Sequence, residues 1–254
     1  MIIAIDGVSG SGKTTIAREV AKKLGFGFFS TGLYYRAITY YAMQLKIPET
    51  KQEIISRLLA LSDLKILCDP NGNNVCLLNG HDITENLNTE EINKNVPKYA
   101  SKPYIRKFVQ QLQHKTAEYT PNLVMEGRDI GSVIFPDAEL KIFVTCNAKT
   151  RALRRAKQLW AKGENVDYDE VLTDLMKRDY QDTHRQHSPL VKCEDAVVID
   201  TSTNPVCICV ESIEKCYQLR KNPTLSREEQ IIAEAMQYFW AKSEELAPTL
   251  TRNC

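Results

Sequence analysis

The chain has 254 residues, of which 43% are hydrophobic and 26% are charged, as is usual for a globular protein in water. Its 33 Lys and Arg residues nearly balance 32 Asp and Glu residues, so the formal net charge of +1 does not favour an extended nucleic-acid surface. Its 8 cysteines show no C-x-x-C spacing, no apolar run reaches the length of a membrane span, and no basic leader begins the chain. We therefore expect a cytoplasmic protein with buried thiols, no membrane partner and no nucleic-acid partner.

The first apolar run, Ile2–Ile5, leads directly into a phosphate-binding motif and then into a helical pattern over Lys13–Leu24. The motif matches G-x-x-x-x-G-K-S/T, in which backbone amides and the positive end of the helix attract phosphate oxygens. Lys13 would reach the β- and γ-phosphates of ATP, and the Thr14 hydroxyl would ligate Mg²⁺. An ordinary Gly/Ser-rich turn with a chance lysine is the alternative. The residues expected to bind the nucleotide are Gly7, Val8, Ser9, Gly10, Ser11, Gly12, Lys13, Thr14 and Thr15.

The second predicted strand, Gly27–Ser30, runs into a loop that is a candidate acceptor site. A P-loop fixes the phosphoryl donor but not the acceptor, and phosphoryl-transfer enzymes stabilise the acceptor side with arginines that face the P-loop. The loop reads Thr31-Gly32-Leu33-Tyr34-Tyr35-Arg36, so Arg36 lies one turn into the following helix. Its planar guanidinium suits a phosphate, whereas the alternative is an exposed helix arginine.

Residues from about 33 to 105 form a segment that is too long for a simple crossover between strands. Two helical patterns and two strand-like runs occur in it, at Leu33–Leu45, Gln52–Leu61, Leu64–Cys68 and Val75–Leu78. Turn signals at 69–74 and at Asn79-Gly80 follow the two strand-like runs. The sequence therefore predicts an inserted subdomain with a small antiparallel sheet.

A helical pattern over Ile105–Glu118 leads to the third predicted strand, Leu123–Glu126, and then to Glu126-Gly127-Arg128-Asp129-Ile130-Gly131. A buried apolar strand that runs into a charged, glycine-flanked turn is hard to explain by structure alone. In parallel sheets, the loops at the carboxyl ends of the strands carry the ligand sites. We therefore expect this turn to bind substrate.

The fourth predicted strand, Leu140–Thr145, precedes two helical patterns, Lys149–Lys162 and Tyr168–Asp182, that flank a polar loop at 163–167. Each pattern places charged side chains on one face, because residues three and four apart are neighbours on a helix. These residues are Arg151, Arg154 and Arg155 on the first face, and Arg178, Asp182 and Arg185 on the second. Such a hairpin is suited to close over phosphates as a lid. The alternative is a pair of solvated faces with acid–base pairs.

A fifth strand-like run at Ala196–Asp200 and a helical pattern at Val206–Leu219 complete the alternation, which predicts an α/β fold with a five-stranded parallel sheet and flanking helices. In the tail, Ser226 and Glu229 form a capping box before an apolar pattern, which predicts a further helix of unknown role. We expect a P-loop core at 1–32 and 106–221 with a lid at about 150–185, an insert at 33–105 and a tail at 222–254.

Six segments together resemble the bacterial-type cytidylate kinase family, in family order and over about residues 1–220. They read IAIDGVSGSGKTTIA, STGLYYRA, NGHDIT, VMEGRDIGSVIFPDAELKIF, RALRRAKQLWAKG and KRDYQDTHR followed by SPL. The resemblance implies the P-loop kinase fold, an enlarged monophosphate-binding insert, and Mg²⁺-dependent transfer of the γ-phosphoryl group of ATP to CMP or dCMP. We expect these small nucleotides to be the partners of a monomer.

The resemblance also implies roles for residues of the acceptor site. Arg36 and Arg128 would hold the acceptor phosphate, with Thr31 and Tyr35 beside them. Asp129 and Arg106 would read the cytosine edge. A buried carboxylate that accepts from the exocyclic amine is left unpaired when uracil binds, so the site discriminates against uracil.

The remaining roles concern the lid and the chemistry. Arg178 and Asp182 would contact the ribose, Arg185 would contact the reacting phosphates, and Arg151, Arg154 and Arg155 would belong to the lid. The predicted catalytic residues are Lys13, Arg128, Arg155 and Arg185. We expect in-line transfer without a covalent enzyme intermediate, and no general base is evident.

Two positions depart from the family pattern. Pro97 stands where the family commonly has a serine that contacts the base, and proline offers neither a hydroxyl nor an N–H. Glu126 stands where many relatives have aspartate. Three other functions are open: a P-loop kinase for a different small molecule, a GTPase, for which no suitable N-K-x-D motif occurs, and a non-catalytic nucleotide sensor whose tail helix binds a partner.

Overall fold

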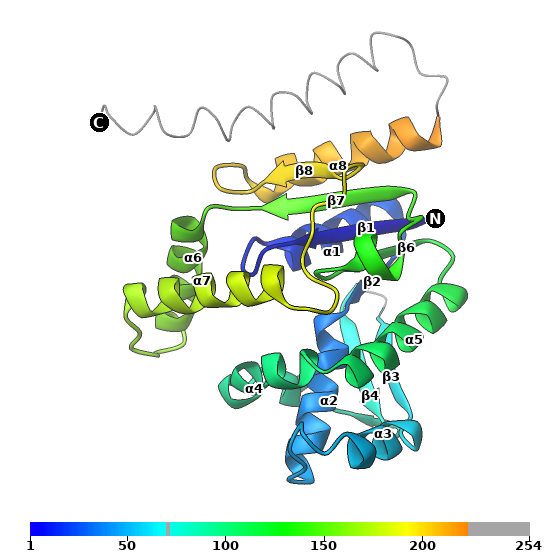
Figure 1. Ribbon diagram of the computed structural model, residues 1–254. Coiled ribbons are helices and arrows are strands. Elements are labelled where there is room, and N and C mark those ends of the chain that lie inside the picture. Colours follow the sequence, from blue (N-terminus) through cyan, green and yellow to red (C-terminus); the bar gives the residue numbers. More distant parts are fainter. Residues whose placement is uncertain (70–71, 223–254) are drawn as a thin grey trace.

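A five-stranded parallel sheet forms the centre of the molecule in the computed structural model, which describes residues 1–69 and 72–222 (Figure 1). The strands follow the order β2-β6-β1-β7-β8. Their bounds are Ile2–Gly7 for β1, Gly27–Ser30 for β2, Leu123–Glu126 for β6, Leu140–Thr145 for β7 and Val197–Asp200 for β8. All four pairings are parallel, with Ile3 opposite both Val124 and Leu140. The predicted α/β class and parallel sheet are confirmed.

Alternate side chains of β1, β2 and β6 enter two different cores, because successive residues point to opposite faces of a sheet. Ile3, Ile5 and Val124 pack with α1 (Lys13–Leu24) and α8 (Val206–Lys221) on one face. Ala4 and Met125 face the other core, which includes the insert. These three strands are therefore buried on both faces, as their sequences predicted, whereas β7 and β8 bury only alternate side chains.

The helix α1 forms where its apolar residues recur on one face. Ile16, Ala17, Val20 and Ala21 are buried against the sheet, and full burial of a large aliphatic side chain such as Ile16 contributes about 1.5–3 kcal/mol. The helix ends at Gly25, whose φ of 69° provides the left-handed cap that closes many helices. The predicted bounds of this helix match the observed ones.

The insert consists of helices around a three-stranded antiparallel sheet of order β3-β4-β5. Its elements are α2 (Gly32–Gln44), α3 (Gln52–Ala60), β3 (Leu64–Cys68), β4 (Asn74–Leu78), β5 (His81–Asp82), η1 (Thr84–Asn88) and α4 (Glu90–Ala100), and α5 (Pro103–Tyr119) then leads from the insert back to β6. Asn79 and Gly80, with φ values of 51° and 82°, form the tight turn between β4 and β5. The two helices and two strands predicted before residue 79 are confirmed, whereas β5, η1 and α4 were not predicted.

The side chain of Asn74 joins the insert to the edge of the central sheet. Its Nδ2 donates to Phe28 O at 2.6 Å, and its Oδ1 accepts from Ser30 N at 2.8 Å. The amide thus pairs with β2 as a neighbouring strand would, so β4 is held against the strand that leads into the acceptor loop.

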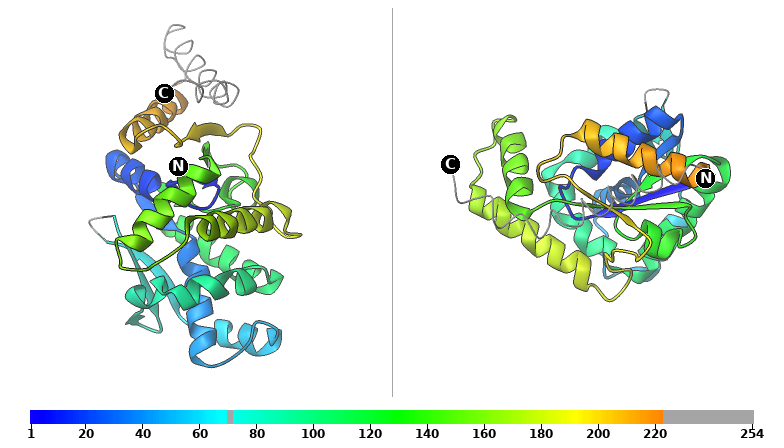
Figure 2. Two further views of the ribbon diagram at one scale, coloured as in Figure 1. Left: turned by 90° about the vertical axis from the view of Figure 1, so that its left-hand side faces the viewer. Right: turned by 90° about the horizontal axis from the view of Figure 1, so that it is seen from above.

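Two helices form the hairpin predicted as a lid, α6 (Ala148–Trp160) and α7 (Tyr168–His184), and they lie side by side at the outside of the molecule (Figures 1 and 2). Side-chain caps begin both helices, because Asn147 accepts from Thr150 N and Asp167 accepts from Asp169 N and Glu170 N. No residue of α7 is fully buried. The helix predicted from Ser226 lies outside the described residues. Within the described ranges, no helix has the length and apolar composition needed to cross a membrane.

Candidate active site

A cleft of about 460 Å³ opens where β1, β2 and β6 end. From the P-loop, it is lined by Ser9, Gly10, Lys13 and Thr14. From the start of α2 and its N-cap, it is lined by Thr31, Tyr35 and Arg36, and from the turn after β6 by Arg128 and Asp129. From α5 and from the end of the lid, it is lined by Arg106, Arg178, Asp182 and Arg185. Segments about 170 residues apart in sequence therefore meet at one site. The site lies at the carboxyl ends of the parallel strands, which is where ligands bind in sheets of this kind.

The P-loop wraps tightly over the end of β1. Gly7 has a φ of 149°, and a Cβ atom there would lie 2.0 Å from Val144 O, so only glycine fits. Lys13 is buried, and its Nζ donates to Val8 O at 2.7 Å. Burial, and after it the charge of Arg128, lowers the pKa of Lys13 to about 7. An anion bound here would restore the charged form of this lysine.

The carboxylate of Glu126 joins the start of α1 to the end of β2, a role that was not predicted although Glu126 begins the turn expected to bind substrate. Its Oε1 accepts from Thr14 Oγ1 at 3.1 Å and from Ser30 Oγ at 2.5 Å. Glu126 is 5% exposed at the end of β6. Glu126 could have been predicted from the sequence, because it ends a buried parallel strand, and ligands bind at the carboxyl ends of such strands.

The oxygen donors beside Lys13 suit Mg²⁺, which prefers hydroxyl, carboxylate, phosphate and water oxygens. Thr14 and Glu126 are the residues of this chain that fit it. In the part of the chain that the structure describes, no group of three or more His, Cys, Asp or Glu residues could hold a metal ion. A divalent cation here would therefore depend on nucleotide phosphates for further ligands.

Four arginines, Arg36, Arg128, Arg178 and Arg185, concentrate positive charge in the cleft opposite the P-loop. Burial lowers the pKa of Arg36, Arg178 and Arg185, and neighbouring arginines act in the same direction. The buried Nη2 of Arg185 has no hydrogen-bond partner among the described residues. Such a cluster favours binding of a polyanion, which would supply the missing acceptors and counter-charge.

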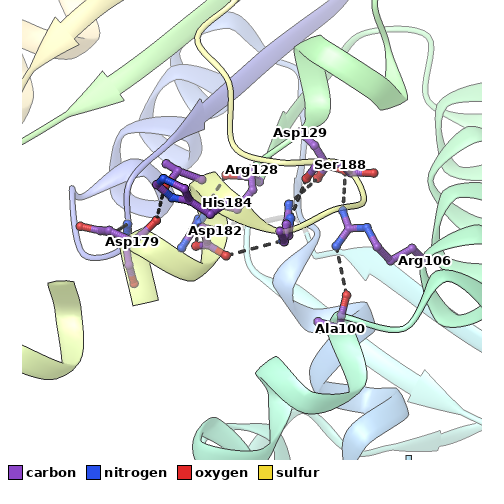
Figure 3. Close-up of polar contacts among 12 residues, drawn as sticks. Ala100, Arg106, Arg128, Asp129, Asp179, Asp182, His184 and Ser188 are labelled. Atoms are coloured by element: carbon purple, nitrogen blue, oxygen red, sulfur yellow. Dashed lines mark hydrogen bonds and ion pairs between the residues drawn. The ribbon is translucent and has the colours of Figure 1, made fainter. Parts of the chain in front are cut away.

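One carboxylate of the lid helix partly balances this cluster. Asp182 accepts from Arg128 Nε at 2.8 Å and lies 3.5 Å from Arg185 Nη1 (Figure 3). Arg178, Asp182 and Arg185 all line the cleft, as expected for residues that share one helix face, although Arg185 lies just beyond the end of α7.

A buried ion pair forms the far end of the cleft. Arg106 Nη2 lies 2.5 Å from Asp129 Oδ2, and these two side chains are 8% and 6% exposed (Figure 3). Arg106 also donates to Ala100 O at 3.2 Å and lies over the ring of Tyr35, 5.5 Å from its centre. Its buried Nε has no partner in the described part of the chain. This end can therefore recognise a planar polar group by hydrogen bonds.

The three arginines of α6 differ in position, and none of them lines the cleft. Arg151 is buried, donates to Ser9 O and Cys146 O at 2.9 Å, and pairs with Asp179 at 2.6 Å, so it supports the P-loop from behind. Arg154 donates to Thr201 O at 2.6 Å. Arg155 is exposed. Contacts of these arginines with phosphate remain a prediction, which requires the lid to move.

The family model for cytidylate kinase matches residues 3–219. The chain belongs to the cytidylate kinase family. The cytidylate kinase of Carboxydothermus hydrogenoformans is 44% identical over 202 residues, which are 80% of this chain and 90% of that relative. The cytidylate kinase of Flavobacterium johnsoniae is 43% identical over 206 residues, with 79% and 88% covered. The predicted membership of the cytidylate kinase family is confirmed, and the family match ends before the tail.

Proposed function

We propose that this member of the cytidylate kinase family transfers the γ-phosphoryl group of ATP to CMP or dCMP and releases ADP with CDP or dCDP. The observation that carries the proposal is that the P-loop, the arginine cluster and the Arg106–Asp129 pair face one cleft. ATP would occupy the end at Lys13. The acceptor phosphate would lie among Arg36, Arg128 and Arg185, with its base toward Asp129.

The chemistry of Asp129 favours cytosine over uracil. Its Oδ2 is engaged by Arg106, while no hydrogen bond to its Oδ1 occurs among the described residues. The exocyclic amine of cytosine would donate to this oxygen, which lies 3.9 Å from Arg185 Nη2, whereas uracil presents a carbonyl oxygen and would leave Oδ1 of the buried carboxylate without a hydrogen bond. Discrimination between the two bases follows from that difference.

The transfer itself needs positioning and charge stabilisation rather than a covalent intermediate. Lys13 and Arg128 both line the cleft and would stabilise the charge that develops on the transferred group, together with Arg185. Arg155 would join them when the lid closes. Thr14 and Glu126 would hold Mg²⁺, which supplies further charge neutralisation on the phosphates. A phosphate acceptor is already a nucleophile, so no general base is required.

The same proposal concerns the setting in which the enzyme works. A near-neutral chain with a cleft sized for small nucleotides fits a cytoplasmic monomer that binds ATP, CMP and dCMP. It gives no reason to expect a nucleic-acid partner.

The test is turnover of CMP, dCMP, UMP and AMP, each at the same concentration with ATP and Mg²⁺, followed by ADP release. The proposal predicts that CMP and dCMP are phosphorylated at least about tenfold faster than UMP and AMP. Faster turnover of UMP or AMP would identify a kinase for another monophosphate. Binding of ATP without turnover of any of the four would identify a nucleotide sensor.

A further inference from the structure

We propose that Asp6, at the end of β1, is a positioning residue that sets the backbone of the acceptor-binding turn and thereby aims Arg128 and Asp129 into the cleft. Asp6 Oδ1 accepts from Ile130 N at 2.9 Å, and Asp6 Oδ2 accepts from Gly131 N at 2.8 Å. One carboxylate thus binds two successive backbone amides that lie more than a hundred residues along the chain. This role in the acceptor reaction rests on the proposed function.

The two amides are the first of the short π-helical turn η2 (Ile130–Ile134), which begins directly after Asp129. The carbonyl of Asp129 accepts from Val133 N at 2.9 Å and from Ile134 N at 3.1 Å. Hydrogen bonds therefore hold both the start of the turn, through Asp6, and its end, through the carbonyl of Asp129. Because Asp129 is adjacent to Ile130, a shift of the anchored amides moves its side chain relative to Arg106.

Burial of the ionised carboxylate of Asp6 is energetically unfavourable. The residue is 5% exposed, and none of the described Lys or Arg side chains forms an ion pair with it. Burial raises the pKa of Asp6 to about 6, although the two amides and Lys13 act in the opposite direction. A buried charge of this kind is compensated chiefly by its hydrogen bonds to the turn, and to a smaller extent by the charge of Lys13, which indicates that Asp6 serves to hold the turn.

The arrangement places the donor and acceptor sites on one strand. Gly7, the next residue after Asp6, begins the P-loop, and Gly127 N donates to Ile5 O at 3.0 Å just before the acceptor turn. The strand β1 therefore carries the P-loop at its end and holds the acceptor turn through Ile5 and Asp6. Since phosphoryl transfer depends on the distance and alignment of two phosphates, a common support for both sites contributes directly to their geometry.

The experiment compares Asp6→Asn and Asp6→Ala with the native protein, and uses Ile142→Val as a control for loss of packing in the neighbouring strand. Asp6→Asn keeps the volume but turns an amide N–H₂ toward a backbone N–H. The proposal predicts that both Asp6 variants raise KM for CMP at least about tenfold while KM for ATP stays within about twofold. It also predicts faster hydrogen exchange at the amides of Ile130 and Gly131. The control should change neither constant beyond about twofold.

A role in packing alone would leave Asp6→Asn close to native, with a lower melting temperature as the largest effect in Asp6→Ala. Unchanged KM for CMP in Asp6→Asn, or equal rises in KM for CMP and ATP, would overturn the proposal. If the native protein does not phosphorylate CMP, the proposed function fails. The exchange of the two amides still tests the anchor in that case, and unchanged exchange in both variants would reject it.

Discussion

Arg128 Nε donates to Asp182 Oδ2 at 2.8 Å, which joins the turn after β6 to the lid helix α7. The turn is fixed to the central sheet, whereas α7 has no fully buried residue and packs beside α6. The contact therefore crosses from the rigid core to the element expected to move. If α6 and α7 close over the cleft as we propose, we expect this contact to couple their closure to the orientation of Arg128.

Replacement of Arg128 tests its place on the acceptor side. Arg128→Ala should lower kcat by about 10²–10³-fold, because it removes a guanidinium that stabilises charge on the transferred group. The affinity for ATP, measured by calorimetry, should stay nearly native, and Arg57→Ala, which changes an exposed arginine of the insert, serves as the control. A parallel loss of ATP affinity would place Arg128 on the donor side instead.

Replacement of Asp182 tests the coupling between lid and acceptor. Asp182→Asn keeps the shape but removes the charge that balances Arg128 and Arg185, so kcat/KM for CMP should fall by about tenfold. Asp174→Asn changes an exposed carboxylate of the same helix and should have no effect. In a double-mutant cycle with Arg128→Ala, the two losses should not add. Strict additivity would mean that the ion pair has no role in turnover.

The base selectivity should depend on Asp129. In Asp129→Asn, the side-chain amide can donate to a uracil carbonyl as readily as it can accept from a cytosine amine. The ratio of kcat/KM for CMP to that for UMP should fall by about tenfold or more. Equal ratios in the native protein and the variant would show that other groups read the base.

The sequence was most informative where local pattern decides structure. The bounds of α1, β2, β6 and β7 followed from buried apolar runs and from the P-loop context. The helix α4 was missed because Pro97 lies inside it, although Pro97 costs only one backbone donor near the end of the helix. Local patterns describe burial and capping well, but α4 depends on packing against α2 and α5.

The site was predictable as a set of residue types, but not as a set of contacts. The P-loop and the acceptor turn were visible because glycine and arginine are unusual after buried strands. The roles of Glu126 and Asp6 were missed, since each depends on atoms contributed by segments more than a hundred residues away. Sequence spacing also could not separate Arg151, which supports the P-loop, from Arg155, which is exposed.

The pKa of Lys13 provides a test that depends on pH. Since burial and Arg128 lower this pKa to about 7, most of the lysine is neutral in the free protein at about pH 8. Phosphates favour the charged form, so ATP binding should take up a proton there, and ATP affinity should fall as the pH rises from about 7 to about 9.

Calorimetry in two buffers with different ionisation enthalpies measures this uptake. In Lys13→Arg, the guanidinium is charged throughout this range, so the uptake should disappear. Equal uptake in the variant would assign the proton to another group, and no uptake in the native protein would show that Lys13 keeps the same protonation state when ATP binds.

The central claim is that two nucleotides bind at once with their phosphates facing each other across the cleft. A crystal structure with CMP and a non-hydrolysable ATP analogue tests it most directly. We predict that the triphosphate lies on the P-loop at Lys13, that the phosphate of CMP contacts Arg36 and Arg128, and that its base meets Asp129. Binding of CMP on the P-loop, or a cytosine that points away from the Arg106–Asp129 pair, would contradict the account.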